Sequence, residues 1–196
     1  MDPAPKEYDV TKDSPFAVWL TGLPAAGKTT LAQELASELR QQGITVQILD
    51  SDELRSVLTP DPTYTSEERD WFYRVIAFIA RLLTQNGVGV IIAATANRRR
   101  YRRYAREGIE HFAEVYVKCS LETCMERDQK GIYEQALAGD ATTVPGLQVP
   151  YEPPSHPAAV VDTEMMSAQE GAHHILEALQ DLSFAGRAIG GSCSKS

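Results

Sequence analysis

The stretch that decides the fold is Gly22-Leu23-Pro24-Ala25-Ala26-Gly27-Lys28-Thr29-Thr30. It contains the pattern G-x-x-x-x-G-K-[ST], whose fixed positions are Gly22, Gly27, Lys28 and Thr29. The glycines of this pattern let the backbone turn so that several N–H groups point at one anion. The lysine reaches the β- and γ-phosphates, and the hydroxyl that follows it ligates Mg²⁺. The stretch therefore predicts a phosphate-binding loop.

The residues on either side of this loop favour a real site over a chance glycine turn. Residues 16–21 form a short apolar run that suits a buried strand, and the leucines of 30–39 recur at helical spacing. A helix that starts at the loop adds its own free N–H groups and its dipole to the anion site. We therefore expect a strand, the loop and a helix in succession.

Apolar runs typical of strands alternate with helical patterns along the chain. We expect strands at 16–21, 44–49, 88–94, 112–118 and 158–162, and helices at about 28–41, 66–86, 98–110, 121–128 and 168–180. Strands separated by helices imply parallel pairing with right-handed crossovers. The sequence therefore predicts an α/β fold with three layers, in which helices flank a parallel sheet of about five strands and ligands bind at the carboxyl ends of those strands.

Residues 129–157 interrupt this alternation. Five of the 11 prolines of the chain fall here, at Pro145, Pro150, Pro153, Pro154 and Pro157. A loop of this length inside a compact domain is usually functional or disordered. In a phosphoryl-transfer enzyme we expect it to be a lid that excludes water. The rest of the chain divides into a flexible arm at 1–14, a single domain at 15–182 and a flexible tail at 183–196.

The composition argues against several classes of protein. The chain has 196 residues and a formal net charge of −8, so we expect no nucleic-acid partner. It has no run of 18 apolar residues and no apolar signal core at its N-terminus, so we expect no membrane span. Three cysteines without metal-like spacing indicate reduced thiols in a cytoplasmic protein, and the four histidines form no ligand set.

Two carboxylates stand where the second expected strand ends. Asp50 and Asp52 lie two residues apart there, and this end of the strand is expected near the phosphate loop. One carboxylate can hold the hydration shell of Mg²⁺, and the other can orient or deprotonate an attacking hydroxyl. Arg55 follows on the next helix and can grip an anionic substrate. A solvated turn with a helix cap is the alternative, but the phosphate loop nearby favours a functional role.

Two basic segments follow later strands. One holds six arginines in nine residues, Arg98-Arg99-Arg100-Tyr101-Arg102-Arg103-Tyr104-Ala105-Arg106. Such a run is more often a solvated helix face, with a few members turned to an anionic ligand, than a nucleic-acid patch. In the other, Arg127 and Lys130 lead into the expected lid, which could bring their charge onto the γ-phosphate or the second substrate. Surface charges beside a loop are the alternative.

Five segments, in this order and at this spacing, resemble the adenylyl-sulfate kinases. They are GLPAAGKTT (22–30), LDSDELR (49–55), RDQKGIY (127–133), PYEPP (150–154) and VVDT (160–163). These enzymes are P-loop kinases that phosphorylate the 3′-hydroxyl of adenosine 5′-phosphosulfate (APS). The resemblance covers about residues 15–180. Its specificity comes from the lid motifs, because many NTPases share the phosphate loop.

The resemblance implies a P-loop kinase fold, Mg²⁺ with ATP as the cofactor, ATP and APS as substrates, a role in sulfate assimilation and a homodimer. Asp52 would be the base near the accepting hydroxyl, and Lys130 would neutralise charge across the two substrates. The implied catalytic residues are Lys28, Asp50, Asp52 and Lys130, and the implied metal ligands are Thr29 and Asp50. ATP binding is implied for Gly22, Leu23, Pro24, Ala25, Ala26, Gly27, Lys28, Thr29, Thr30, Arg127 and Thr163. Substrate binding is implied for Asp52, Arg55, Tyr64, Arg69, Phe72, Lys130, Gly131, Ile132 and Val144.

The chain departs from the family pattern on the acceptor side. The segment FSxxDRxENxRR appears here as Tyr64 to Val75, with Phe72 in place of an asparagine that contacts the substrate and Val75 in place of an arginine. The family's SPY reads Ala96-Asn97-Arg98, and its FTG reads Val144-Pro145-Gly146, which removes an aromatic expected to stack on the adenine. Two alternatives therefore stay open beside an APS kinase. One is a kinase of the same build with another small acceptor, and the other is an ATP-binding regulatory module without transfer.

Overall fold

The computed structural model describes residues 15–190 of the chain, and the side chains of residues 15–180. Its centre is a parallel five-stranded sheet in the order β2-β3-β1-β4-β5. The strands are β1 (Ala17–Thr21), β2 (Val46–Asp50), β3 (Gly89–Ala93), β4 (Phe112–Lys118) and β5 (Ala159–Asp162). The predicted fold class, the parallel pairing and all five strands are confirmed, with small shifts at strand ends.

Strand β1 separates two hydrophobic cores. Val18 and Leu20 pack into one of them, and Ala17 and Trp19 pack into the other, because successive side chains of a strand point to opposite faces. All four are fully buried. Coverage of both faces explains why this strand reads as a continuous apolar run instead of an alternating one.

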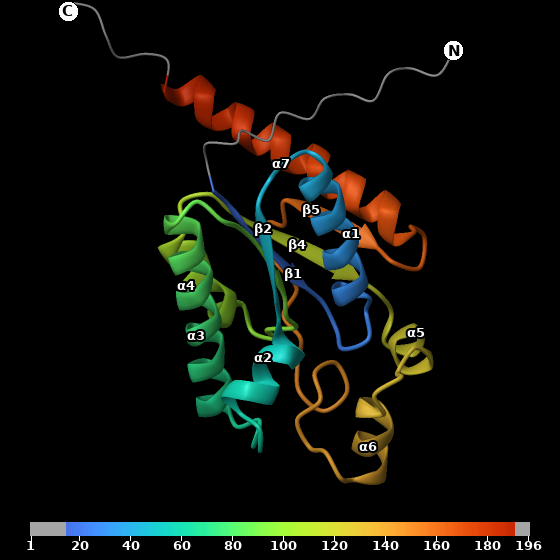
Figure 1. Cartoon of the computed structure of the whole chain (residues 1–196). Helices are drawn as coiled ribbons and strands as arrows, with labels where there is room; N and C mark the ends of the chain where they lie inside the picture. The colour runs from blue at the N-terminus through green and yellow to red at the C-terminus, as the bar shows by residue number, and fades with distance from the viewer. Residues whose placement is uncertain (1–14, 191–196) are drawn as a thin grey trace, which may run out of the picture.

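Helices cover both faces of the sheet in the described part of the chain. They are α1 (Lys28–Gln41), α2 (Ser51–Leu58), α3 (Ser66–Gln85), α4 (Arg99–Gly108), α5 (Leu121–Glu126), α6 (Ile132–Ala138) and α7 (Ala168–Gly190). Helices α1 and α7 lie together on one face, and α3 and α4 lie together on the other (Figure 1). Helices α2, α5 and α6 gather with the loops beyond the carboxyl ends of the strands, at the bottom of the view. This edge is where the three-layer prediction puts the ligands.

Two short helices lie outside the predicted helix ranges. Helix α2 starts directly after β2, where Arg55 is expected on a helix of unstated bounds, and α6 lies inside the predicted lid. The start of α6 is held by Asp128, whose Oδ2 accepts the N–H of Tyr133 at 2.6 Å. The lid is therefore part helix and part loop.

The C-terminal helix is longer than predicted. Helix α7 runs to Gly190, beyond the predicted end at about residue 180 and into the predicted tail at 183–196. The predicted arm at 1–14 and the last part of that tail, 191–196, lie outside the described residues. None of the described helices is long and apolar enough to cross a membrane.

One arginine of the arginine-rich run is a buried structural anchor. Arg102 is fully buried on α4 and donates to Glu114 Oε1 at 2.9 Å, to Glu152 O at 2.7 Å and to Ala96 O. It thereby joins β4, the end of the lid and the loop after β3. The expectation of a solvated face is wrong at this position, because the composition of the run does not reveal which side of the helix faces the sheet.

Candidate active site

The phosphate-binding loop connects β1 to α1, as predicted. Gly27 is the residue before α1 and has a φ of 91°, a left-handed conformation that glycine adopts without strain. Gly22 lies against β4, and a Cβ built on it would stand 2.3 Å from Val117 O. Both fixed glycines of the motif are therefore required by geometry, one for the turn and one for the close approach of a neighbouring strand.

Lys28 points back over the loop that precedes it. Its Nζ donates to Leu23 O at 2.7 Å and to Gly22 O at 3.3 Å. Burial lowers the pKa of Lys28 to about 8, against the opposing effect of the Asp52 and Asp50 charges. A lysine held in this way is ready to exchange its carbonyl partners for phosphate oxygens.

Thr29 and Asp50 form a pair of oxygen donors beside the loop. The Thr29 hydroxyl donates to Asp50 Oδ2 at 2.7 Å, and Asp50 Oδ1 accepts the N–H of Asp52 at 2.8 Å. Asp50 is thus also the N-cap of α2. The expected role near Mg²⁺ and the alternative of a helix cap therefore apply to the same residue. Hard oxygen donors suit Mg²⁺, which uses few protein ligands when phosphates supply others. No cluster of three or more His, Cys, Asp or Glu exists among the described residues, and such a site does not need one.

Lys130 reaches from the lid to Asp52. The two side chains form an ion pair, and this contact raises the pKa of Lys130. Both side chains are more than half exposed, so the pair itself contributes little to stability. It does bring together a lid residue and a residue that follows β2, which lie 78 positions apart in the sequence.

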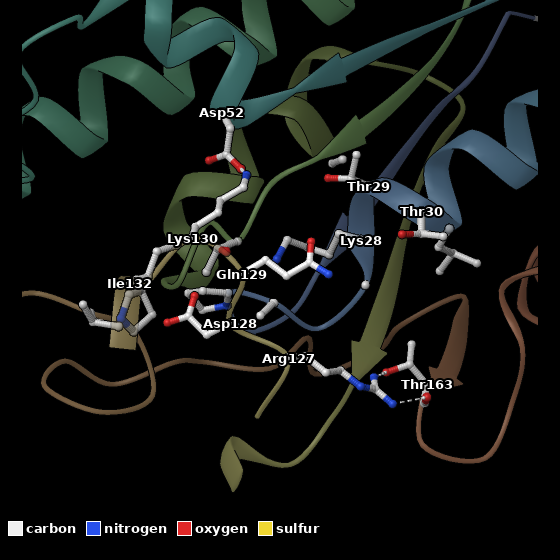
Figure 2. Close-up of a pocket in the computed structure, with 18 of the residues that line it drawn as sticks. Lys28, Thr29, Thr30, Asp52, Arg127, Asp128, Gln129, Lys130, Ile132 and Thr163 are labelled. Carbon is white, nitrogen blue, oxygen red and sulfur yellow. Dashed lines mark hydrogen bonds and ion pairs between the residues drawn. The ribbon is translucent and has the colours of Figure 1, made fainter. Parts of the chain in front are cut away.

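Arg127 and Thr163 form a contact beside the phosphate-binding loop. Arg127 donates from Nη1 to Thr163 Oγ1 at 3.1 Å and from Nη2 to Thr163 O at 3.0 Å (Figure 2). The Thr163 hydroxyl donates in turn to Ala26 O at 3.2 Å, which ties both residues to the phosphate loop. The structure thus groups all the residues predicted for ATP binding around one loop.

Arg55 lines the cavity of the site from α2, about one helical turn after Asp52. Its Nη1 donates to Glu68 Oε1 at 3.0 Å, and its guanidinium lies 3.9 Å from the ring centroid of Phe72 and 4.9 Å from that of Tyr64. Phe72 itself is fully buried and does not line the cavity described below. It is placed behind Arg55, as its support.

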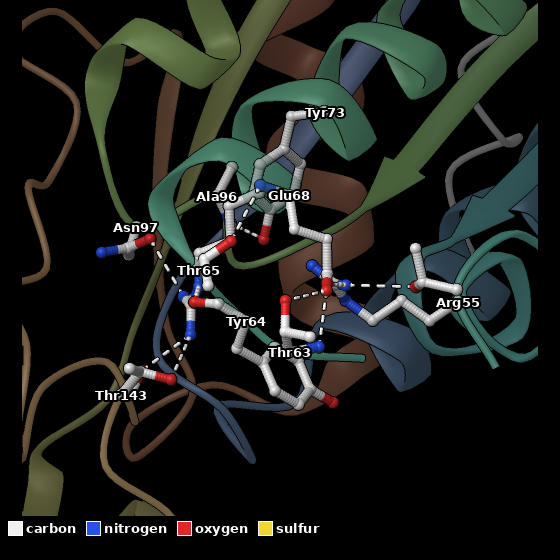
Figure 3. A network of polar contacts seen from close by, with 11 residues as sticks. Arg55, Thr63, Tyr64, Thr65, Glu68, Tyr73, Ala96, Asn97 and Thr143 are labelled. Carbon is white, nitrogen blue, oxygen red and sulfur yellow. Dashed lines mark hydrogen bonds and ion pairs between the residues drawn. The ribbon is translucent and has the colours of Figure 1, made fainter. Parts of the chain in front are cut away.

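Arg69 joins the loop before α3 to the lid. It donates from Nε to Tyr64 O at 3.0 Å, from Nη1 to Asn97 Oδ1 at 3.3 Å, and from Nη2 to Thr143 O at 2.7 Å (Figure 3). Burial lowers the pKa of Arg69, although its guanidinium still borders the cavity. A lid residue, Thr143, therefore lines the same cavity as Arg69 and holds its guanidinium.

These residues surround one cavity of about 660 Å³. Of the predicted residues, the structure places Pro24, Ala25, Gly27, Lys28, Thr29, Thr30, Asp52, Arg55, Tyr64, Arg69, Arg127, Lys130, Ile132, Val144 and Thr163 on its wall. It leaves Gly22, Leu23, Ala26, Asp50, Phe72 and Gly131 off the wall.

Further lining residues lie outside the predicted set, notably Tyr73, Thr95 and Thr143. Thr95 follows β3 at the same sheet edge as Asp50, so the rule that identified Asp50 could have found it. Tyr73 and Thr143 carried no such signal. Tyr73 lies on the buried face of a helix, and Thr143 lies in a lid whose path the sequence does not reveal.

Comparison with known proteins gives a consistent set of relatives. A model of the adenylylsulphate kinase family matches residues 14–162. A probable adenylyl-sulfate kinase of Pyrococcus abyssi is 40% identical over 169 residues, which cover 86% of this chain and 97% of the relative. An adenylyl-sulfate kinase of Halothermothrix orenii is 42% identical over 164 residues, which cover 84% and 89%. The solved APS kinase CysC of Mycobacterium tuberculosis, in complex with AMPPNP and APS, is 31% identical with a TM-score of 0.80 and covers 85% of this chain and 98% of that one.

Proposed function

Because this chain belongs to the adenylyl-sulfate kinase family, we propose that it transfers the γ-phosphate of ATP to the 3′-hydroxyl of APS, giving 3′-phosphoadenosine 5′-phosphosulfate and ADP. The observation that supports this most is one cavity whose wall holds both the phosphate loop and two arginines, Arg55 and Arg69. The ion pair of Asp52 and Lys130 is near both groups, because its charges act on Lys28 and Asp52 lies about one helical turn before Arg55 on α2. A kinase of this reaction needs two anionic substrates to meet at such a point.

The nucleotide side is assigned to the phosphate loop and its neighbours. The N–H groups of the loop and the start of α1 bind the phosphates, and Lys28 neutralises the β- and γ-phosphates. Arg127 and Thr163 bind near the base and phosphates of ATP. Thr29 and Asp50 would hold Mg²⁺, which when bound neutralises phosphate charge.

The transfer step is assigned to Asp52 and Lys130. Asp52 accepts the proton of the 3′-hydroxyl as its oxygen bonds to the γ-phosphorus, and the bond from that phosphorus to the bridging oxygen of ADP breaks. Lys130 leaves Asp52 for the phosphates once both substrates are present, because their negative charge exceeds that of one carboxylate. This exchange frees Asp52 to act as the base and stabilises the charge that develops in the transition state.

The acceptor side is assigned to basic and aromatic groups of the cavity wall. Arg55 and Arg69 bind the anionic part of APS, and Tyr64 offers a ring on which the adenine can stack. Ile132, Gly131 and Val144 border the acceptor from the lid, and Phe72 acts by supporting Arg55. The comparisons support APS as the acceptor and do not support the alternative kinase or the regulatory module.

Two further properties complete the proposal. A homodimer would use the exposed face of α3, where Trp71, Phe78 and Leu82 share one side of the helix and are each about half exposed. A cytoplasmic location agrees with Cys119 and Cys124, which are free thiols. Burial raises the pKa of Cys124 to about 12, which leaves that thiol unreactive.

A coupled assay of ADP release tests the function. Purified protein receives Mg-ATP with APS, adenosine 5′-monophosphate or unrelated alcohols as acceptors. We expect turnover that depends on APS at micromolar concentration. Turnover with another acceptor alone would support the alternative kinase, and ATP binding without any turnover would support the regulatory module.

A further inference from the structure

Arg69 is a buried cation without a carboxylate partner. It is 8% exposed, and among the described residues it makes no ion pair. Other sheltered arginines of the chain are neutralised, since Arg102 pairs with Glu114 at 2.9 Å and Arg55 pairs with Glu68 at 3.0 Å. A buried charge without a counter-charge is costly, so its retention at the cavity wall points to an anion supplied by the ligand.

Asn97 is the neutral group that holds this cation. Its side chain is almost fully buried, and Oδ1 accepts from Arg69 Nη1 at 3.3 Å (Figure 3). Nδ2 of the same amide donates to Pro150 O at 2.9 Å. The backbone N–H of Glu152 donates to Asn97 O at 2.7 Å. Asn97 therefore links Arg69 on α3 to residues 150–152, in the last part of the lid.

We propose that Asn97 is a positioning residue for the acceptor, which fixes Arg69 with an uncharged amide so that its full charge remains for the anionic group of APS. The inference rests on the proposed function, because it names the anion that Arg69 receives. A carboxylate at this position would hold Arg69 equally well and would neutralise it. An amide holds the guanidinium through a hydrogen bond and leaves its net charge unchanged.

The two contacts of the Asn97 amide support this role. The Asn97 amide also reaches Pro150, so the contact to Arg69 and the contact to the lid come from one side chain.

The competing explanation is that Asn97 only anchors the lid. A variant of Arg99 can distinguish this explanation from the proposal. Arg99 Nε donates to Pro153 O at 2.7 Å, and its backbone N–H donates to Glu152 Oε2 at 2.9 Å. It thus holds the same end of the lid. No contact joins Arg99 to Arg69 among the described residues, and Arg99 does not line the cavity.

The test compares three variants, Asn97→Asp, Asn97→Ala and Arg99→Ala, by the KM for APS, the KM for ATP and the melting temperature. We expect Asn97→Asp to raise the KM for APS by about tenfold or more, the scale of one hydrogen-bonded charge. Asn97→Ala should raise it less, because Arg69 loses a partner but keeps its charge. The KM for ATP should stay within about twofold in both, and Arg99→Ala should leave both constants unchanged.

The order of the KM values for APS in the Asn97 variants decides the outcome, even if the variants are less stable than the wild type. Two results would overturn the role of Asn97 and leave the proposed function standing. One is a KM for APS that follows the melting temperature across the three variants, and the other is a larger effect of Asn97→Ala than of Asn97→Asp. A wild-type protein without turnover of APS would overturn the proposed function and this inference together.

Discussion

Burial decides how a single residue of this site responds to pH, and Lys28 shows it most clearly. Because burial lowers its pKa to about 8, the charged form dominates below that pH and is lost above it. We therefore predict that kcat/KM for ATP, which reports the free enzyme, is level at lower pH and falls as the pH rises through about 8. The variant Lys28→Arg, whose guanidinium stays charged, should be slower but should lack this fall. The same fall in both proteins would assign it to another group.

Asp52 is the residue that we propose as the base of the transfer step. We predict that Asp52→Asn lowers kcat by two or more orders of magnitude without loss of folded protein, because the amide cannot accept the hydroxyl proton. Glu53→Gln is the matched control, since Glu53 is the next carboxylate on α2 but does not line the cavity. Steady-state rates with ATP and APS measure both, and wild-type turnover in Asp52→Asn would remove it as the base.

Phe72 is a case where the structure changes what a substitution should do. An asparagine at this position would match the family pattern, but the ring is fully buried and supports the guanidinium of Arg55 at 3.9 Å. We predict that Phe72→Asn destabilises the protein by about 3–5 kcal/mol, as loss of a core phenylalanine does, and raises the KM for APS. Denaturant unfolding and steady-state kinetics measure these two effects. Higher APS activity in Phe72→Asn would show that the acceptor pocket has drifted from APS.

The role of a single residue was predictable where a motif specifies the residue type. It was not predictable where the role depends on packing between elements that are distant in the sequence. The motif identified Lys28, and the sheet-edge rule identified Asp50, because phosphate binding needs those residue types at those positions. The burial of Phe72 and the uncharged contact between Asn97 and Arg69 depend on how a helix, a loop and the lid pack together. Residue spacing along the sequence does not predict those contacts.

Among the elements of the fold, the lid is the one that we propose to contact both substrates. Its tip reaches the phosphate loop at Gly146, where a Cβ would stand 2.6 Å from Leu23 Cδ2. We predict that Gly146→Ala forces Leu23 to rotate away and raises the KM for ATP severalfold. Gly139→Ala is the control, because its φ of 89° is nearly the same but nothing lies within 4 Å of its Cβ. Both variants should lose about 1–2 kcal/mol of stability from the left-handed backbone. Equal kinetics in the two variants would show that the contact with Leu23 does not matter.

Long periodic elements were predictable, whereas the bounds of α2 and the existence of α6 were not. The pattern of buried residues on α1 and α3 repeats over several turns and identifies them as helices. Helices α2 and α6 have only eight and seven residues and show no long period, although α5, with six, lies inside a predicted helix. Helix α6 depends on Asp128 for its start, a contact that a prediction of a proline-rich loop does not anticipate.

At the scale of the whole molecule, the exposed face of α3 is expected to join two copies of the chain. We predict that Phe78→Glu together with Leu82→Glu converts a dimer to a monomer in sedimentation velocity, because two charges would be buried at the interface. Leu137→Glu, an exposed apolar position on α6, should leave the dimer intact. A wild-type protein that sediments as a monomer would contradict the proposal directly.

The order of the strands brings the loop after β1, the residues after β2 and the lid before β5 to one edge of the sheet (Figure 1). That arrangement follows from parallel pairing, so the position of the site was predictable from the alternation of strands and helices. The shape of the acceptor end was not, since it comes from side chains of α2, α3 and the lid.

Product analysis tests the central claim most directly. Wild-type protein and Lys28→Ala are incubated with Mg-ATP and APS, and the nucleotides are separated by chromatography and identified by phosphorus NMR. The wild type should form ADP and 3′-phosphoadenosine 5′-phosphosulfate in equal amounts, with the new phosphate on the 3′-oxygen, and Lys28→Ala should form neither at a comparable rate. Release of ADP without a phosphorylated acceptor, or a phosphate on any other oxygen, would contradict the assignment of this cavity to APS phosphorylation.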